Sequence, residues 1–188
     1  MVVGGMTQYL AKVQGMPKDV EERIEKRIRR FLWAEKTNVT VNKETIYAPK
    51  DMGGRNLLDI VARNEAVSIT WLKAYLTFGK DRPLWAYVTD EILSIKALGS
   101  AKHVEETLRT CPYLQTWRPK LSDLSEDLAQ MIKVGDKYHL EMESLAIARE
   151  TQREMPIWYH NKSSAKKKLF NRGPEIKCLR RNHQVRLV

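Results

Sequence analysis

The sequence has few cysteines and no paired metal-binding motif. Its 188 residues include two cysteines, Cys111 and Cys178, which lie far apart. Cys178 and His183 form a C-x4-H fragment of a zinc knuckle, but Glu175 and Val188 stand where the knuckle needs further cysteines. Two reduced thiols are typical of an intracellular protein, so we expect a nuclear or cytoplasmic location.

The sequence also lacks a membrane segment and a secretory signal. No apolar run is long enough to span a bilayer, and residues 1–5 are too short and uncharged for a signal peptide. Gly4 and Gly5 are more typical of a joint than of a designed start. We therefore expect a fragment of something longer, without a membrane partner.

Catalytic motifs are missing too. There is no Walker A loop, no G-x-G-x-x-G, no G-x-S-x-G and no H-x-x-x-H. Polymerases need carboxylates that converge on divalent cations, yet no aromatic-x-Asp-Asp turn occurs, and residues 87–91 come nearest only within an expected helix. His139-Leu140-Glu141 contains an H-x-E without the C-x-x-C of a deaminase. We expect no enzyme activity of the isolated chain, no metal site and no cofactor.

Positive charge is present in excess. Lys and Arg number 33 against 23 Asp and Glu, a net charge of +10, which favours polyanionic partners such as RNA or DNA. Residues 162–188 hold nine basic residues and one acid, so most of the surplus lies in this tail. Residues 163–168 resemble a flexible basic linker, which a solvated tail or a nuclear-import signal explains as well as nucleic-acid contact does.

Residues 17–33 predict a basic amphipathic helix that begins at Pro17. One stripe is apolar: Val20, Ile24, Ile28, Phe31 and Leu32. A second stripe is cationic: Arg23, Lys26, Arg27 and Arg30. Acids come early and arginines late, which complements the helix dipole. The cationic stripe fits phosphate binding, and it also fits a solvated helix face that has no ligand.

The next segment predicts a hairpin, a turn and a core helix. Residues 37–42 alternate between polar and apolar side chains, and residues 45–48 are β-prone. Together they predict a small hairpin over 37–48. Gly53-Gly54 allows a positive φ or a close backbone approach. From Leu57 to Phe78 apolar residues cover most of the circumference, which predicts a buried helix in which Asn64 is a structural hydrogen-bonding residue.

Further helices are expected over residues 84–95, 104–111, 121–132 and 141–152, with a turn at Gly135-Asp136. On the helix over 84–95, Trp85, Val88, Ile92 and Ile95 share one face. The fold class is therefore mainly α: a helical bundle with a small β-hairpin near 37–48 and a basic, partly flexible C-terminal tail.

Several short motifs follow one another in a recognisable order. They are Gly4-Gly5-Met6-Thr7-Gln8-Tyr9-Leu10, Gln14-Gly15-Met16-Pro17, Phe31-Leu32-Trp33, Pro49, Gly53-Gly54, Asn64-Glu65-Ala66 and Trp71-Leu72, followed by Pro156-Ile157-Trp158-Tyr159-His160 and Cys178-Leu179-Arg180-Arg181-Asn182-His183. In this order the motifs up to Trp71-Leu72 resemble the region just after the polymerase palm in non-LTR (LINE-type) retrotransposon reverse transcriptases, as found in mushroom-forming fungi. The last two resemble segments of the same elements that lie before a ribonuclease H region. The resemblance is strongest over residues 4–93 and weak over 99–154.

This resemblance implies the thumb and connector of an RNA-directed DNA polymerase. In that family the thumb is helical, packs beside the palm and grips the template–product duplex through its backbone. The matching positions between Phe31 and Trp71 look structural. We divide the chain into a thumb-like helical region at 1–98, a helical connector at 99–160 and a basic tail at 161–188. Fingers, palm, endonuclease and ribonuclease H regions are absent from the sequence.

The expected function is a non-catalytic piece of such a polymerase that binds RNA or an RNA–DNA duplex and packs on the palm of a longer protein. The candidate nucleic-acid-binding residues are Arg23, Lys26, Arg27, Arg30, Arg55, Lys166, Lys167, Lys168, Arg180 and Arg181. Two alternatives stay open. One is a structural remnant of a truncated polyprotein with no ligand, and the other is a small helical DNA-binding protein, for which the helix after Gly54 is too apolar.

Overall fold

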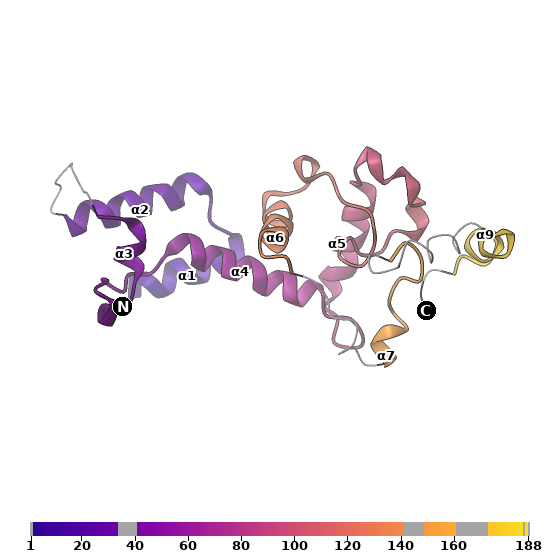
Figure 1. The fold of residues 1–188 in the computed structure, drawn as a ribbon, viewed down its shortest axis with the longest axis horizontal. Helices are drawn as coiled ribbons and strands as arrows, with labels where there is room; N and C mark the ends of the chain where they lie inside the picture. The colour runs from indigo at the N-terminus through magenta and orange to yellow at the C-terminus, as the bar shows by residue number, and fades with distance from the viewer. Residues whose placement is uncertain (1, 34–40, 141–148, 161–172, 186, 188) are drawn as a thin grey trace. The chain divides into compact units, whose positions relative to one another are not determined.

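The computed structural model describes residues 2–33, 41–140, 149–160, 173–185 and 187. Over these residues the chain is mainly helical, with eight α-helices, short 3-10 turns and only three isolated β-bridges, which confirms the predicted fold class (Figure 1). The chain divides into two compact units, Met1–Thr70 and Trp71–Val188. None of the described helices is both long and apolar enough to cross a membrane.

The division differs from the expected boundary at residue 98. Helix α5 (Leu84–Ile95) belongs to the second unit because its C-terminal end is bonded to later residues. Ser94 donates through its hydroxyl to the Glu106 carbonyl at 3.4 Å, and Arg109 donates to the Ser94 carbonyl at 3.0 Å. These contacts tie the last turn of α5 to the segment that the sequence assigned to a separate connector.

The first unit contains four α-helical segments and one 3-10 turn: α1 (Val2–Gln14), α2 (Lys18–Leu32), α3 (Lys43–Tyr47), η1 (Lys50–Met52) and the first part of α4 (Ile60–Tyr75) (Figure 1). Gly15, with φ of 71°, ends α1 in the left-handed conformation that glycine adopts readily. Helix α2 is the predicted basic helix, and it begins and ends within one residue of the expected bounds 17–33.

The predicted hairpin is wrong where the structure describes it. Residues 45–48 lie in and just after α3, and residues 37–40 lie outside the described residues. Asn42 begins the helix, because its side-chain oxygen accepts from the Glu44 backbone N–H at 3.5 Å. Ile46, which β-propensity placed in a strand, is instead buried from the short capped helix α3.

The glycine pair behaves as its sequence predicts. Gly53 has φ of 79°, and the backbone of Gly54 lies so close to Ala48 that a Cβ atom there would come within 1.9 Å of the Ala48 carbonyl oxygen. The N–H groups of Gly54 and Asn56 donate to the carbonyls of Pro49 and Ala48, each at 2.9 Å. The loop between α3 and α4 is thereby folded tightly onto itself.

The second unit continues with α5, 3-10 turns and shorter helices: η2 (Gly99–His103), η3 (Glu106–Leu108), η4 (Leu121–Asp123), α6 (Glu126–Lys137), α7 (Arg149–Gln152) and α9 (Pro174–Arg181). Its core is one cluster: Leu72, Tyr75, Ala86, Leu93, Ala101, Val104, Cys111, Leu114, Trp117, Met131, Ile132 and Met155. The segment expected as a helix over 104–111 forms only a 3-10 turn, and Leu124 and Ser125 separate η4 from α6 within 121–132.

Two expectations about faces need correction. Helix α5 buries Ala86, Thr89 and Leu93, whereas Val88 and Ile95 are exposed, because Asp90 on the buried face is held by inward polar contacts. Helix α4 is buried at Ile60, Leu72 and Tyr75 rather than around its circumference, and Trp71 is exposed.

Gly135 is not a turn but an inward position of α6. A Cβ atom there would lie 2.5 Å from Tyr113 Oη and 2.6 Å from Leu72 Cδ2, so the glycine gives these side chains room to approach the helix. Of the expected helix over 141–152, residues 141–148 lie outside the described residues, and α7 forms its end.

Candidate nucleic-acid interface

Two hydrogen bonds determine which face of α2 points inward. Glu21 accepts from the Asn64 side-chain amide of α4 at 2.8 Å, and Glu25 accepts from the Tyr47 hydroxyl of α3 at 2.9 Å. Burial and the bond to Glu25 raise the pKa of Tyr47 to about 12, so the hydroxyl stays a donor at neutral pH. The prediction that Asn64 has a structural hydrogen-bonding role is confirmed.

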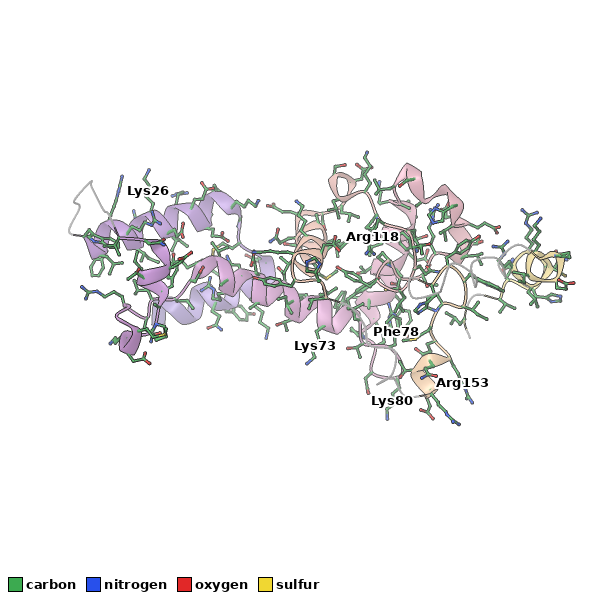
Figure 2. All side chains as sticks on the ribbon, viewed as in Figure 1. Lys26, Lys73, Phe78, Lys80, Arg118 and Arg153 are labelled. Atoms are coloured by element: carbon green, nitrogen blue, oxygen red, sulfur yellow. The ribbon has the colours of Figure 1, made fainter. Side chains whose placement is uncertain are left out.

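The opposite face of α2 presents the predicted cations. Arg23, Lys26, Arg27 and Arg30 are all exposed, and none of them forms an ion pair with another residue in the described ranges. Figure 2 shows the Lys26 side chain extending away from the helices of the first unit. From Arg23 to Arg30 the face extends about 10 Å along the helix axis. We call these four residues the α2 cationic face.

Positive charge on this face is concentrated toward the C-terminal end of α2. Asp19 and Glu22 are also exposed, one turn before Arg23 and Lys26, and they offset part of the charge in the first half of the helix. After Glu25, which is turned toward Tyr47, α2 contains no further acid. The last two turns therefore carry an uncompensated cationic surface.

Phe31 does not follow the predicted apolar stripe. Val20, Ile24, Ile28 and Leu32 are half-buried, but Phe31 is 88% exposed. At 100° per residue Phe31 lies within the apolar stripe, between Val20 and Ile24, yet its ring is exposed at the last turn of α2. The sequence placed it in the core because hydrophobic spacing gives the apolar face of a helix and not which turns of that face are covered.

Arg55 and the C-terminal candidates lie elsewhere in the chain. Arg55 is exposed on the loop after Gly54, and its backbone N–H donates to the Ile46 carbonyl at 3.3 Å. Arg181, at the end of α9, is exposed as well. Lys166, Lys167 and Lys168 lie outside the described residues. Among the candidates that the structure describes, it brings together the four residues of the α2 cationic face on one exposed surface.

Arg180 is buried rather than presented to a ligand. It donates to the Tyr159 hydroxyl at 2.6 Å and lies 3.9 Å from a Glu105 carboxylate oxygen. Its guanidinium also lies over the rings of Trp158 and Tyr159, at 5.9 and 5.7 Å. These contacts make Arg180 part of the packing of the second unit. We therefore remove it from the candidate interface.

A buried polar cluster in the second unit was not foreseen from the sequence. Asp90 accepts from Arg82 at 2.6 Å and from the Tyr75 hydroxyl at 2.7 Å. The Arg82 guanidinium lies over the rings of Phe78 and Tyr87, at 4.5 and 4.8 Å. Burial raises the pKa of Asp90 to about 6, against the lowering effects of the Tyr75 hydrogen bond and the Arg82 charge.

The nearby thiol is enclosed. Cys111 is fully buried, and burial raises its pKa to about 11, so it is protonated at neutral pH. The described residues contain no group of three or more His, Cys, Asp or Glu side chains that could hold a metal ion. The contacts of Arg82, Asp90 and Tyr75 supply structural support within the second unit.

A second buried polar residue, Gln115, bonds through every polar position of its side-chain amide. Its oxygen accepts from the Trp117 indole N–H at 2.7 Å and the Thr110 backbone N–H at 2.8 Å, and its nitrogen donates to the carbonyls of Leu108 and Trp158 at 2.9 Å each. Of these four partners, only Trp117 lies within four residues of Gln115 in the sequence. The other partners depend on the tertiary fold.

Comparison with known proteins gives no relative: no family model, curated protein or solved structure matches this chain.

Proposed function

We propose that this chain is a non-catalytic nucleic-acid-binding piece of a retrotransposon-type reverse transcriptase, in which the α2 cationic face contacts the phosphate backbone of an RNA or RNA–DNA duplex. One observation carries the proposal. The acids Glu21 and Glu25 are turned inward by Asn64 and Tyr47, while four cations on the same helix stay exposed without ion-pair partners among the described residues.

This arrangement favours backbone contact over sequence reading. Guanidinium groups match phosphate oxygens bidentately, and three of the four side chains are arginines. Contacts to phosphate carry no base information, so binding should be tolerant of sequence. It should also weaken steeply with salt, because each neutralised phosphate releases bound counterions.

The test is a combined replacement of Arg23, Lys26, Arg27 and Arg30 by Gln. Fluorescence anisotropy of a labelled RNA–DNA hybrid is recorded across a salt series with the full chain and the variant. We expect the slope of log affinity against log salt to become shallower by about 3, because about four phosphate contacts are removed. An unchanged slope and affinity would show that the face is only solvated.

A charge-matched control separates the α2 cationic face from general positive charge. Lys73, Lys80, Lys133 and Arg153 are exposed cations of the second unit, three of them labelled in Figure 2. Replacing these four by Gln removes the same charge. We expect a slope close to that of the unaltered protein. An equal loss in both variants would indicate attraction by net charge alone.

The contribution of the basic tail is tested by replacing Lys166, Lys167 and Lys168 with Gln in the full chain. Truncation at Asn161 would be a poor test, because it removes Arg180 and Val185. Arg180 bonds to Tyr159, and the Trp158 indole donates to the Val185 carbonyl at 2.6 Å. If the lysine variant loses most of the binding and the α2 variant loses little, the tail carries the interaction.

A second candidate function is a structural piece of a longer polyprotein that has no ligand of its own. The observation in its favour is the solvent-exposed face formed by Leu84, Val88 and Ile95 of α5, which are 84%, 60% and 65% exposed. This candidate predicts no salt-dependent binding of the hybrid. It also predicts self-association that falls when these three residues are replaced by Ser, as measured by sedimentation velocity.

A further inference from the structure

We propose that Phe31 is a stacking platform for an unpaired base, so that the α2 surface binds single-stranded nucleic acid or a single-stranded segment beside a duplex. This inference rests on the proposed function and names the substrate that the same surface prefers. Phe31 is 88% exposed on the last turn of α2, next to Arg30 and one turn beyond Arg27.

The ring of Phe31 is open to solvent. Among the described residues, none makes a ring contact or cation–π contact with Phe31. In the second unit, by contrast, Trp71 and Trp85 pack edge to face at 5.5 Å, and Arg82 covers Phe78. A flat apolar surface of Phe31 is therefore free to meet a ligand.

The charges around this ring identify the occupant. Residues 26–32 hold four cations and no acid, and Glu25 is turned toward Tyr47. These cations exceed the partial negative charge of the helix C-terminus. Arg27 is an i,i+4 neighbour of Phe31, about 6 Å away between Cβ atoms. A ligand with a flat base and an adjacent phosphate satisfies both residues, which is the arrangement that proteins use for single strands.

A paired duplex cannot use the ring in this way. Its bases are paired and stacked on one another, so along the duplex their faces are closed to the ring while the phosphates stay accessible to the α2 cationic face. Phe31 should therefore contribute to the affinity for single strands and not to the affinity for a blunt duplex. This selectivity distinguishes stacking from general attraction by the cations, which act on both probes.

The experiment compares Phe31→Leu with the unaltered full chain on two labelled probes, a 12-nucleotide oligo(rU) and a blunt RNA–DNA hybrid. Loss of one stacked base should weaken oligo(rU) binding about 5- to 100-fold, with hybrid binding changed less than about twofold. Phe31→Trp should keep the oligo(rU) affinity. Phe31 is exposed, so thermal melts of the variants should match the unaltered protein.

A second readout locates the base directly. Oligo(rU) carrying 5-iodouracil is irradiated in the complex, and the cross-linked peptide is identified by mass spectrometry. We expect a cross-link at Phe31 that disappears in Phe31→Leu. A cross-link confined to another part of the chain overturns the proposal.

The outcomes separate this inference from the function on which it rests. If Phe31→Leu binds both probes like the unaltered protein, or weakens both equally, the stacking role is wrong while phosphate binding stands. If the unaltered protein binds neither probe, the proposed function fails, and the inference fails with it.

Discussion

The two units use the same guanidinium group in opposite ways. In Met1–Thr70, Arg23, Arg27 and Arg30 are exposed on α2. In Trp71–Val188, Arg82 and Arg180 are enclosed by aromatic rings and bonded to Asp90 and Tyr159. A desolvated cation needs such partners, whereas a solvated one remains available to an external anion. Neighbouring side chains, and not residue type, decide which arginines can bind a ligand.

The units also differ in how much core they have. Among the residues whose burial is described, the first unit has three buried hydrophobic residues, Ala11, Ile46 and Ile60, whereas the second unit has sixteen. The first unit relies on polar links between helices, such as Glu21 with Asn64. We infer that substitutions on its surface alter binding, and that the large stability effects occur in the second unit.

The largest expected effect is that of Gln115→Leu. This change leaves the buried Trp117 indole N–H, the partly buried Thr110 N–H and two buried carbonyls of the second unit without their partner, at about 1–3 kcal/mol for each unsatisfied group. We expect the free energy of unfolding to fall by more than about 4 kcal/mol. Urea denaturation followed by tryptophan fluorescence measures this, since four of the five tryptophans lie in the second unit.

Gln14→Leu is the control for Gln115→Leu, because Gln14 is exposed at the end of α1. It should change stability by less than about 0.5 kcal/mol. Equal, small losses of stability for both substitutions would contradict the inference that the large stability effects occur in the second unit. Gln115 would then contribute no more to the free energy of unfolding than a surface residue does.

Arg82→Leu should have the next largest effect, and that effect should depend on pH. Burial raises the pKa of Asp90 from 3.8 to about 6, so folding takes up a proton between these values and the free energy of unfolding falls as pH rises through this window. Without Arg82 the Asp90 pKa rises further, and an unpaired carboxylate remains at pH 8. We expect a loss of about 3 kcal/mol at pH 8 and a smaller loss at pH 5, measured by urea denaturation.

Arg153→Leu, at an exposed position of the same unit, serves as the control for Arg82→Leu and should have little effect at either pH. A loss for Arg82→Leu that is the same at pH 5 and pH 8 would show that Asp90 does not change its protonation in this range. The destabilisation would then come from lost packing on Phe78 and Tyr87.

The smallest of the three effects is expected in the first unit, from Gly54→Ala. The added Cβ would lie 1.9 Å from the Ala48 carbonyl oxygen, so the backbone must shift, at a cost of about 2 kcal/mol. Amide hydrogen exchange of α3 and α4 should rise, while exchange in the second unit stays unchanged. Gly99→Ala is the matched control, because no atom lies within 4 Å of the Cβ position there.

Features that depend on local sequence were predicted well. The ends of α2 and α5 follow from proline and hydrophobic spacing, and both helices lie within about one residue of their expected bounds. The roles of Gly53 and Gly54 follow from the conformational freedom of glycine. Four of the ten candidate interface residues, Arg23, Lys26, Arg27 and Arg30, share one exposed face because helical geometry alone places them together.

Features that depend on distant residues were predicted poorly. On the predicted apolar stripe of α5, Val88, Ile92 and Ile95 are exposed and only Trp85 packs against the core, because Asp90 is drawn inward by Arg82 and Tyr75. Gly135 packs against Tyr113 and Leu72 instead of turning the chain. Arg180 counts as a tail cation in the sequence, yet Tyr159 and Glu105 bury it. None of these partners lies within four residues, so spacing rules could not find them.

The sequence by itself determined that the chain is mainly helical, that α2 has a cationic face and that Gly53 and Gly54 shape the loop before α4, because these properties arise from interactions within a few residues. Only the tertiary structure decided which charges are solvated. Asn64 and Tyr47 turn the acids of α2 inward, and Tyr159 and Glu105 enclose Arg180. Burial depends on contacts between segments distant in the chain, and a charged side chain acts on a ligand only when those contacts leave it exposed.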